Sequence, residues 1–348
     1  MNLFKIIFQI LMVPFAGIYR VVTGIRNWLY DRSIFLTIHP VNVPVISIGN
    51  ITAGGTGKTP FVIALANWLS EAGYSPGIIT RGYRRQSKGR HVVRGRNAIL
   101  STPLQSGDEP FLIASSTKQT VIIADADRVA AAETAVQMYA CDIVIADDAF
   151  QHRRLRRDID IVLWDASHNP KTSHILPVGR LRESIKGLRR ADLLLISRTD
   201  SISSSNADYF KKLNPNLFLS ALPMSIRQIS NLATGDVIPP ADLKKMHVLG
   251  FCGLGNPAQF FNTIKILTEI TPVTKSFPDH YKYSTTDLKT LIQQAENSGC
   301  RYLVTTRKDA VNLPDSAKSV RNLLVIDIHY TIDEKIKAAI LNKLPPRN

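Results

Sequence analysis

The sequence predicts an α/β protein with a parallel sheet covered by helices on both faces, a second, smaller α/β domain, and an apolar helix at the N-terminus. Three observations lead to this prediction. Short apolar runs alternate with helical patterns along most of the chain. A glycine-rich loop ending in Lys58-Thr59 connects an early apolar run to a helical pattern. The alternation is interrupted near Gly235 and Pro239-Pro240 and then begins again.

The first sheet is expected to contain continuous apolar strands, which are typical of parallel sheets buried on both faces. The segment 201–206 is polar and fits either a loop or the start of a helix. The strands are expected at 43–48, 77–80, 120–124, 142–146, 159–164 and 193–196, with helices at 61–69 and 128–139.

A second α/β pattern begins near Met246 and ends in a terminal helix. We therefore expect three parts: an N-terminal helix (1–30), a phosphate-loop domain (31–225) and a C-terminal α/β domain (226–348). In the last part, strands are expected at 247–250, 272–277, 302–305 and 323–328, and helices at 258–270 and 285–298.

The loop Ile48-Gly-Asn-Ile-Thr-Ala-Gly-Gly-Thr-Gly-Lys-Thr-Pro60 has the strand, glycine loop, Lys-Thr, helix layout of a phosphate-loop NTPase. Glycines allow backbone N–H groups to surround phosphate oxygens, and the helix N-terminus adds a partial positive charge. Thr52 stands where the strict pattern has glycine. The residues expected to bind ATP are Thr52, Ala53, Gly54, Gly55, Thr56, Gly57, Lys58 and Thr59.

Acidic residues follow at two places. The apolar run 142–146 ends in Asp147 and Asp148, where an acid in a phosphate-loop enzyme binds Mg²⁺ directly or through water. On its own, such a pair is also typical of a turn or a helix cap. Gly107-Asp-Glu-Pro110 fits either a helix N-terminus or a general base with a second acid near the metal. Spacing leaves these two interpretations equally favoured.

Arginines are concentrated after two of the predicted strands. Arg81-Gly-Tyr-Arg-Arg85 is expected at the ligand-binding edge of the sheet, and the segment 151–157 holds four more arginines. Arginine suits bidentate contact with phosphate, although a solvated basic turn explains the second cluster equally well. His280 in Phe277-Pro-Asp-His-Tyr281 makes only a weak case for catalysis from spacing alone.

The net charge of +15 favours anionic partners, namely nucleic acid, acidic lipid headgroups or phosphorylated substrates. No RNA-stacking or zinc-finger pattern is visible. Three widely spaced cysteines argue against a disulfide framework or a zinc cluster and suit a reducing cytosol.

The segment 3–22 is mostly apolar, but Pro14 and basic residues interrupt it, and Trp28 and Tyr30 follow. This composition favours a helix lying in the headgroup region of a membrane. A signal peptide, a single-pass anchor and a helix buried on the core are the alternatives.

Taken in order, several motifs resemble those of the tetraacyldisaccharide 4′-kinase family of lipid A biosynthesis. They are IGNITAGGTGKTP, ITRGYRR, GDEP, IADDAFQHR, PVGRLRE, GFCGLGNP, FPDHY and TTRKDAVNL, and they span about residues 44–313. Ala149 and Arg307 depart from the pattern, where glycine and an acid are expected.

The resemblance implies ATP- and Mg²⁺-dependent phosphorylation of the 4′-hydroxyl of a tetraacylated glucosamine disaccharide 1-phosphate. It implies an active site between two α/β domains, at the cytoplasmic face of the bacterial inner membrane and on an anionic lipid surface, with no nucleic-acid or obligate protein partner. It assigns Asp108 as the general base, supported by His280, and Lys58 as a further catalytic residue. Thr59 and Asp147 are assigned to the metal, where the segment 107–110 adds Glu109 as the second acid. The residues assigned to the substrate are Arg81, Tyr83, Arg128, Asp148, Gln151 and Arg182.

Two other interpretations remain. One is a different phosphate-loop ATPase or GTPase, because Ser197-Arg-Thr-Asp200 loosely resembles a guanine-reading loop, although it lacks the Asn-Lys start. The other is a nucleic-acid binder, which only the charge suggests.

Overall fold

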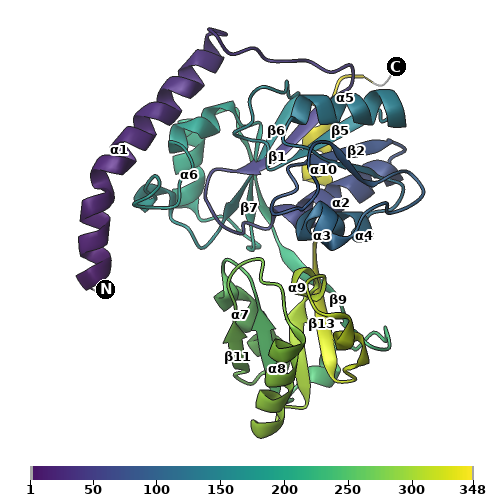
Figure 1. Ribbon diagram of the computed structural model, residues 1–348. Helices are drawn as coiled ribbons and strands as arrows, with labels where there is room; N and C mark the ends of the chain where they lie inside the picture. Colours follow the sequence, from purple (N-terminus) through teal and green to yellow (C-terminus); the bar gives the residue numbers. More distant parts are fainter. Residues whose placement is uncertain (1–2, 347–348) are drawn as a thin grey trace.

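The computed structural model describes residues 3–346, with side chains from residue 11 onward (Figure 1). The ends of the predicted first and last parts, residues 1–2 and 347–348, lie outside the described residues. Two α/β bodies are stacked on each other, and a long helix lies along the flank of the upper one. The elements of each body explain how the residues between them are positioned.

The upper body contains an eight-stranded sheet in the order β3-β4-β2-β5-β1-β6-β7-β8, parallel except for β3. The strands are β1 (Val45–Asn50), β2 (Pro76–Thr80), β3 (His91–Arg94), β4 (Val121–Ala124), β5 (Ile143–Asp147), β6 (Ile159–Asp165), β7 (Leu193–Ser197) and β8 (Phe218–Leu222). The helices are α2 (Lys58–Glu71), α3 (Pro103–Ser106), α4 (Asp108–Ser116), α5 (Arg128–Tyr139) and α6 (Ser204–Leu213), with short 3₁₀ turns at Pro170–Thr172 and Ile185–Arg190.

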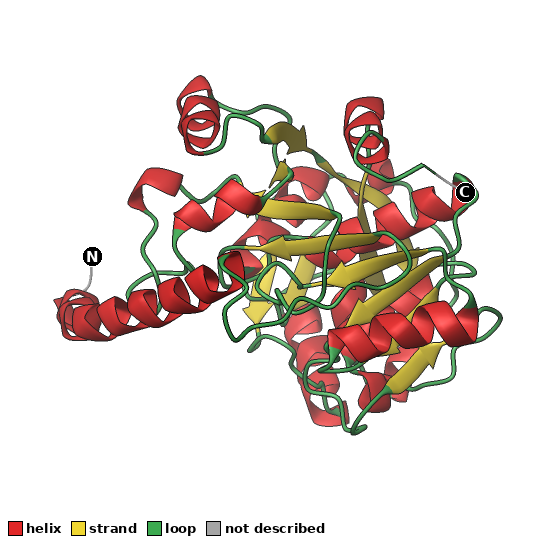
Figure 2. Cartoon of the chain, turned by 90° about the horizontal axis from the view of Figure 1, so that it is seen from above, coloured by secondary structure: helices red, strands yellow, loops and turns green. Residues whose placement is uncertain are grey.

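Helices cover both faces of this sheet, as predicted (Figure 2). Successive strand residues point to opposite faces, so Ile46 and Ile48 pack in the cluster that contains α2, whereas Val45 packs with α5. A third cluster joins α6 to the β6–β7 side of the sheet. Because both faces are covered, the strands are continuously apolar, and the sequence pattern made them recognisable.

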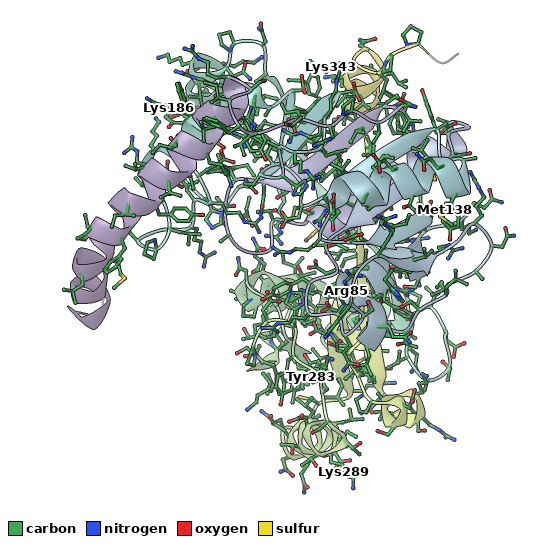
Figure 3. The ribbon with its side chains drawn as sticks, turned by 45° about the horizontal axis from the view of Figure 1, so that its top comes forward. Arg85, Met138, Lys186, Tyr283, Lys289 and Lys343 are labelled. Atoms are coloured by element: carbon green, nitrogen blue, oxygen red, sulfur yellow. The ribbon has the colours of Figure 1, made fainter. Side chains whose placement is uncertain are left out.

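The lower body contains a five-stranded sheet in the order β11-β10-β12-β13-β9, parallel except for β9. Its strands are β9 (Met224–Asn231), β10 (Val248–Cys252), β11 (Val273–Ser276), β12 (Tyr302–Thr306) and β13 (Leu323–Tyr330). Its helices are α7 (Pro257–Thr268), α8 (Thr285–Asn297) and α9 (Arg307–Ala310), with 3₁₀ turns at Pro240–Leu243 and Asp315–Ser319. Tyr283, labelled in Figure 3, packs edge-on against Phe251 and Phe277 in this body.

The final helix, α10 (Glu334–Leu341), returns to the upper body. Ile336 and Ile340 are buried in the same cluster as Phe61 and Leu65 of α2. The sequence places this helix in the C-terminal part (226–348), and the structure corrects that placement. The reason is that the apolar face of α10 completes the cover over α2 instead of packing on the second sheet.

Helix α1 (Leu3–Asp31) projects from the rest of the molecule (Figures 2 and 3). Over the described residues, no helix is long and apolar enough to cross a membrane. Two of its hydrogen bonds reach the 182–183 segment: the Tyr19 hydroxyl donates to the Arg182 carbonyl at 2.9 Å, and the Asn27 amide donates to Glu183 at 2.7 Å. Eight of its large apolar side chains are more than half exposed, unlike those of a helix buried on the core; they are Leu11, Val13, Phe15, Ile18, Val21, Val22, Ile25 and Trp28.

Candidate active site

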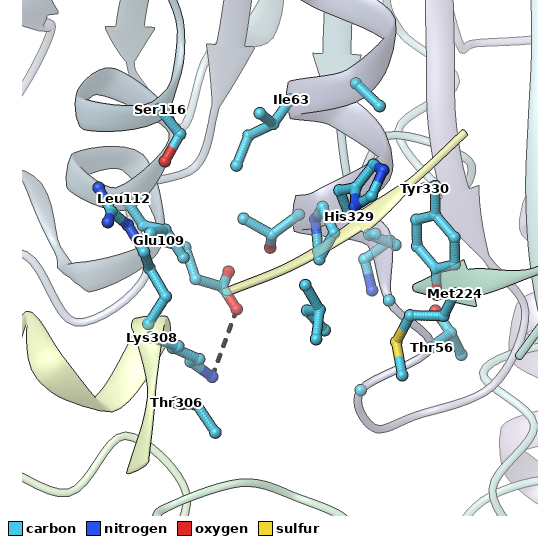
Figure 4. Close-up of a pocket in the computed structure, with 18 of the residues that line it drawn as sticks. Thr56, Ile63, Glu109, Leu112, Ser116, Met224, Thr306, Lys308, His329 and Tyr330 are labelled. Atoms are coloured by element: carbon cyan, nitrogen blue, oxygen red, sulfur yellow. Dashed lines mark ion pairs between the residues drawn. The ribbon is translucent and has the colours of Figure 1, made fainter. Parts of the chain in front are cut away.

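A cleft of about 870 Å³ lies between the two sheets and is lined from both bodies. The upper wall consists of the glycine loop and the carboxyl ends of strands β2 and β5. The lower wall consists of the loops after β10, β11 and β12 together with β13. Figure 4 shows side chains from both walls pointing into this space, among them Glu109 from above and Lys308 from below.

The glycine loop is held in a shape suited to phosphate. Gly57 precedes α2 with a φ of 85°, a conformation that favours glycine, and a Cβ there would overlap the Tyr330 hydroxyl. The Asn50 side-chain amide donates to the Thr56 hydroxyl at 3.1 Å, and the Ser197 hydroxyl donates to the Thr56 carbonyl at 3.0 Å. In the described chain no side chain caps α2, so its first N–H groups face the cleft for a ligand.

Six of the eight residues predicted to bind the nucleotide line the cleft, namely Gly54, Gly55, Thr56, Gly57, Lys58 and Thr59. The other two lie beside the 179–183 segment instead. Thr52 is buried and pairs with Leu181, and the Ala53 N–H donates to the Arg180 carbonyl at 2.6 Å. Threonine therefore replaces the glycine of the strict phosphate-loop pattern at a position where the backbone already pairs with the 179–183 segment.

Asp147 and Asp148 are adjacent but differ in their surroundings. Burial first, and then the carboxylates of Glu109 and Asp148, raise the pKa of Asp147 to about 6. Burial opposes the shift at Asp148, but Lys58 at 3.4 Å and Arg182 at 2.8 Å lower its pKa to about 2. The upper wall thus contains one carboxylate neutralised by cations and one with excess negative charge around it.

These surroundings fit a divalent cation at Asp147. A cation would neutralise the charge that Glu109 and Asp148 impose, and the Thr59 hydroxyl faces the same cleft. In the described part of the chain, no three or more His, Cys, Asp or Glu side chains gather into a complete metal cage. Magnesium usually binds through one or two carboxylates together with phosphate oxygens, so a partial set is what this ion needs.

The second chemical feature of the cleft is a pair formed across the two bodies. His280, in the loop after β11, places Nδ1 at 2.7 Å from Oδ2 of Asp108, the first residue of α4. His280 has a φ of 60°, which is unusual for histidine and is typical of functional sites. The Tyr83 ring lies edge-on to the imidazole at 5.7 Å.

Each member of the pair stabilises the charged form of the other. Burial would raise the pKa of Asp108, but the hydrogen bond and charge of His280, with the charge of Lys308, lower it to about 2. The hydrogen bond that His280 donates to Asp108 in turn raises the pKa of His280, against burial and Lys308. Asp108 is therefore an ionised carboxylate at neutral pH, which is the protonation state that a general base requires.

The residues predicted to contact the substrate lie in two places, the lining of the cleft and the region behind the glycine loop. Arg81, Tyr83, Arg128, Asp148 and Arg182 line the cleft. Gln151 does not: its amide donates to the Asn50 carbonyl at 2.9 Å and to Glu183 at 3.0 Å, behind the glycine loop.

Three further residues at the site were not predicted. Glu183 is fully buried and binds Arg190, Gln151 and Asn27, so it joins α1 to the back of the loop. Lys308 and Asn312 approach Asp108 and His280 from the lower wall. All three lie inside motifs that carry the family resemblance, which was the available signal, but spacing gave no role for any of them.

A phosphate loop at a helix N-terminus, an acid pair behind it and a buried carboxylate–imidazole pair opposite define a phosphate-loop phosphotransferase. The model of the family described as Tetraacyldisaccharide-1-P 4′-kinase matches residues 8–345, and the chain belongs to this family. The resemblance found in the motifs is thus confirmed.

Relatives and a solved structure support this membership. The tetraacyldisaccharide 4′-kinase of Syntrophus aciditrophicus is 35% identical over 322 residues, which cover 89% of this chain and 86% of the relative. That of Chlorobaculum tepidum is 31% identical over 336 residues, covering 92% and 91%. The crystal structure of LpxK from Aquifex aeolicus in complex with ATP superposes with a TM-score of 0.75 at 29% identity, covering 97% of this chain and all of that one.

Proposed function

We propose that this chain transfers the γ-phosphate of ATP to the 4′-hydroxyl of a tetraacylated glucosamine disaccharide 1-phosphate, as in lipid A biosynthesis. The observation that carries the proposal is the Asp108–His280 pair, at 2.7 Å: His280 lines the cleft that contains Lys58 and the glycine loop, and the buried carboxylate of Asp108 lies directly beside it. A nucleotide-binding loop alone also fits a hydrolase or a switch protein. A buried, ionised carboxylate facing it supplies the base that an alcohol acceptor requires.

In the proposed reaction, Asp108 accepts the proton of the sugar hydroxyl while that oxygen bonds to the γ-phosphorus and the bond to ADP breaks. His280 holds the carboxylate in place through Nδ1. Lys58 and the N–H groups of the loop stabilise the charge of the transferred group. Thr59, Asp147 and Glu109 would hold Mg²⁺, which when bound neutralises phosphate oxygens.

The acceptor is a lipid, and helix α1 suits contact with a membrane surface. Its exposed face carries large apolar side chains, and exposed arginines at positions 20 and 32 flank that face. We place the protein at the cytoplasmic face of the bacterial inner membrane, peripheral or monotopic, on an anionic lipid surface. Removal of residues 1–25 should shift the protein from membrane to soluble fractions, and high salt should weaken its association; unchanged fractionation would contradict this placement.

The direct test of the reaction uses γ-labelled ATP and the disaccharide 1-phosphate lipid. We expect label on the lipid with purified protein and Mg²⁺, and none when EDTA replaces Mg²⁺. GTP as donor separates the kinase from a guanine-nucleotide enzyme. A protein that hydrolyses ATP but leaves the lipid unlabelled would exclude the proposed reaction.

A further inference from the structure

The segment 306–313 contributes to the cleft in a way that the reaction described above does not use. It begins at the end of β12, forms the short helix α9 and ends in a turn. Its position is set by Asp309, which accepts hydrogen bonds from the Gly253 N–H at 2.7 Å and the Tyr283 hydroxyl at 2.8 Å. A buried carboxylate with these donors anchors the segment firmly, so that its neighbouring side chains point into the cleft in a fixed direction.

Lys308 lies at the point where three polar groups of the cleft meet. Its Nζ is 3.2 Å from Asp279, 3.6 Å from Glu109 and 3.5 Å from Nε2 of His280. Figure 4 shows the ion pair with Glu109 crossing from the lower wall to the upper one. The lysine side chain is only 21% exposed, so these groups, rather than water, form most of its surroundings.

The contact with His280 constrains the imidazole. An ammonium group has only hydrogens to donate, so the ring nitrogen that faces it must accept. Nε2 is then without a proton, and the ring proton of neutral His280 lies on Nδ1, directed at Asp108. Asp108 already requires this tautomer, because an ionised carboxylate only accepts hydrogen bonds. Lys308 adds to it by disfavouring a second proton on Nε2, which the Asp279 carboxylate at 3.8 Å would otherwise favour.

Asn312 acts on the carboxylate itself. Its side-chain amide lies 3.3 Å from Asp108 Oδ2, the same oxygen that His280 contacts. The other oxygen, Oδ1, accepts the Glu109 N–H at 3.0 Å. Both donors at Oδ2 come from the lower body, so the orientation of Asp108 depends on residues more than 170 positions away in the chain.

We propose that Lys308 and Asn312 are positioning residues: together they hold the Asp108–His280 pair in the tautomer and orientation needed to take a proton from the acceptor hydroxyl. This inference rests on the proposed kinase function for its kinetic consequences, but not for its structural ones. Lys308 acts on the base through His280, and Asn312 contacts the carboxylate of the base rather than the substrate or nucleotide.

The kinetic test is a double-mutant cycle. Lys308→Met, which keeps most of the side-chain length without the charge, should lower kcat by ~10–100-fold while the KM for ATP changes little. The same change in a His280→Ala background should cost less than about threefold, because the lysine acts through the imidazole. Equal losses in both backgrounds, or an unchanged kcat, would overturn the proposal. Lys318→Met is the matched control, since Lys318 pairs with Asp315 on the exposed surface.

Asn312→Ala tests the second residue, with Asn312→Gln as the conservative variant. We expect a loss of kcat in the alanine variant and partial recovery with glutamine, whose amide is able to reach the carboxylate. Melting temperatures within about 2 °C of the parent protein show that the fold is intact. Full activity of Asn312→Ala would remove this residue from the proposal.

A spectroscopic measurement separates this inference from the proposed reaction, because it needs no lipid. In protein labelled with ¹⁵N-histidine at pH 8.5, His280 should show a protonated Nδ1 and an unprotonated Nε2, assigned by loss of the signals in His280→Ala. In a pH titration of the same signals, Lys308→Met should leave Nδ1 protonated, because Asp108 still faces it, but should raise the pH at which Nε2 gains its proton, whereas Lys318→Met should not change that pH. If that pH is the same without the lysine, the inference fails even if the kinase reaction is observed; if no lipid is labelled but that pH rises, the inference stands alone.

Discussion

The two walls of the cleft are built in different ways. The upper wall is centred on a contiguous loop, residues 54–59, that offers mainly backbone N–H groups at the start of α2, beside the polar side chains at the ends of β2 and β5. The lower wall offers side chains from separate segments, His280 after β11 and Lys308 and Asn312 around α9, which meet an acid of the upper body. The first wall takes its geometry from local conformation, and the second from the packing of two bodies.

This difference separates binding from chemistry. Backbone groups at a helix N-terminus suit any phosphate and depend little on the rest of the fold. The base is different, because its hydrogen bonds exist only while both bodies keep their relative position. We therefore expect substitutions in the glycine loop to affect nucleotide binding, and substitutions in the Asp108–His280 pair, which joins the two walls, to affect turnover alone.

The largest effects are expected for Asp108→Ala and Lys58→Ala, which should differ in how strongly they affect nucleotide binding. Loss of a positioned general base typically costs ~10²–10⁴-fold, so Asp108→Ala should lower turnover by this factor while ATP binding persists. Lys58→Ala should damage both nucleotide binding and turnover, because the ammonium contacts phosphate in both states. Isothermal titration with a non-hydrolysable ATP analogue, beside the lipid kinase assay, measures the two quantities. Lost nucleotide binding in Asp108→Ala, or full activity in Lys58→Ala, would contradict the division between the walls.

The second prediction concerns the two carboxylates of the upper wall. The pKa of Asp147, raised to about 6, lies above its unfolded value, so the stability gained by protonation is present below about pH 4 and lost as pH rises through 6. At pH 7 the ionised carboxylate costs the folded, metal-free protein ~3 kcal/mol. Asp147→Asn should therefore raise the melting temperature at pH 7 by ~5 °C, and the gain should disappear at pH 4.

Asp148→Asn is the matched control, and the opposite sign is expected. Its pKa is lowered to about 2 by Lys58 and Arg182, against the effect of burial. Its contribution to stability is thus present at neutral pH and falls only in acid. Differential scanning calorimetry without nucleotide measures both variants. A lower melting temperature for Asp147→Asn at pH 7 would show that the wall does not carry excess negative charge.

The contrast between the walls also explains which features the sequence alone could predict. The phosphate loop and the acid pair follow apolar strands directly, and parallel strands bring their carboxyl ends to one edge of the sheet. The contact between Asp108 and His280 joins residues 172 positions apart, so only the family resemblance brought them together. Lys308 was passed over because no local pattern distinguishes a buried lysine from a surface one.

The prediction of secondary structure from the sequence is limited in the same way, to features that depend on local pattern. The predicted strands, including the exposed edge strand β11, agree with the structure within a residue or two at each end, but β3, β8 and β9 were not predicted. These lie at the edges of the sheets; β9 reads Met-Ser-Ile-Arg-Gln-Ile-Ser-Asn and is largely polar because one of its sides lacks a neighbouring strand. Likewise, the apolar face of α10 was visible in the sequence, but the partner of that face was not.

The smallest effect is expected for a substitution that tests whether the two bodies, and with them the two walls, unfold together. Ser284 caps α8 in the lower body: its hydroxyl accepts the Asp287 N–H at 3.1 Å, and the Asp287 carboxylate accepts the Ser284 N–H at 2.8 Å. Ser284→Ala should cost ~1 kcal/mol and lower the melting temperature by ~2 °C.

The position of α10 predicts which part of the protein is destabilised by Ser284→Ala. Because β13 continues through Ile332 into a helix buried against α2, the lower body has a covalent and apolar connection to the phosphate-loop wall. We expect one calorimetric transition, shifted as a whole by Ser284→Ala and unchanged by Thr285→Ala at the exposed neighbouring position. Two transitions, with only one of them shifted, would mean that the lower body, which carries His280, unfolds while the phosphate loop stays intact. The orientation of Asp108 would then be lost at temperatures where ATP still binds, which is the strongest form of the difference between the walls.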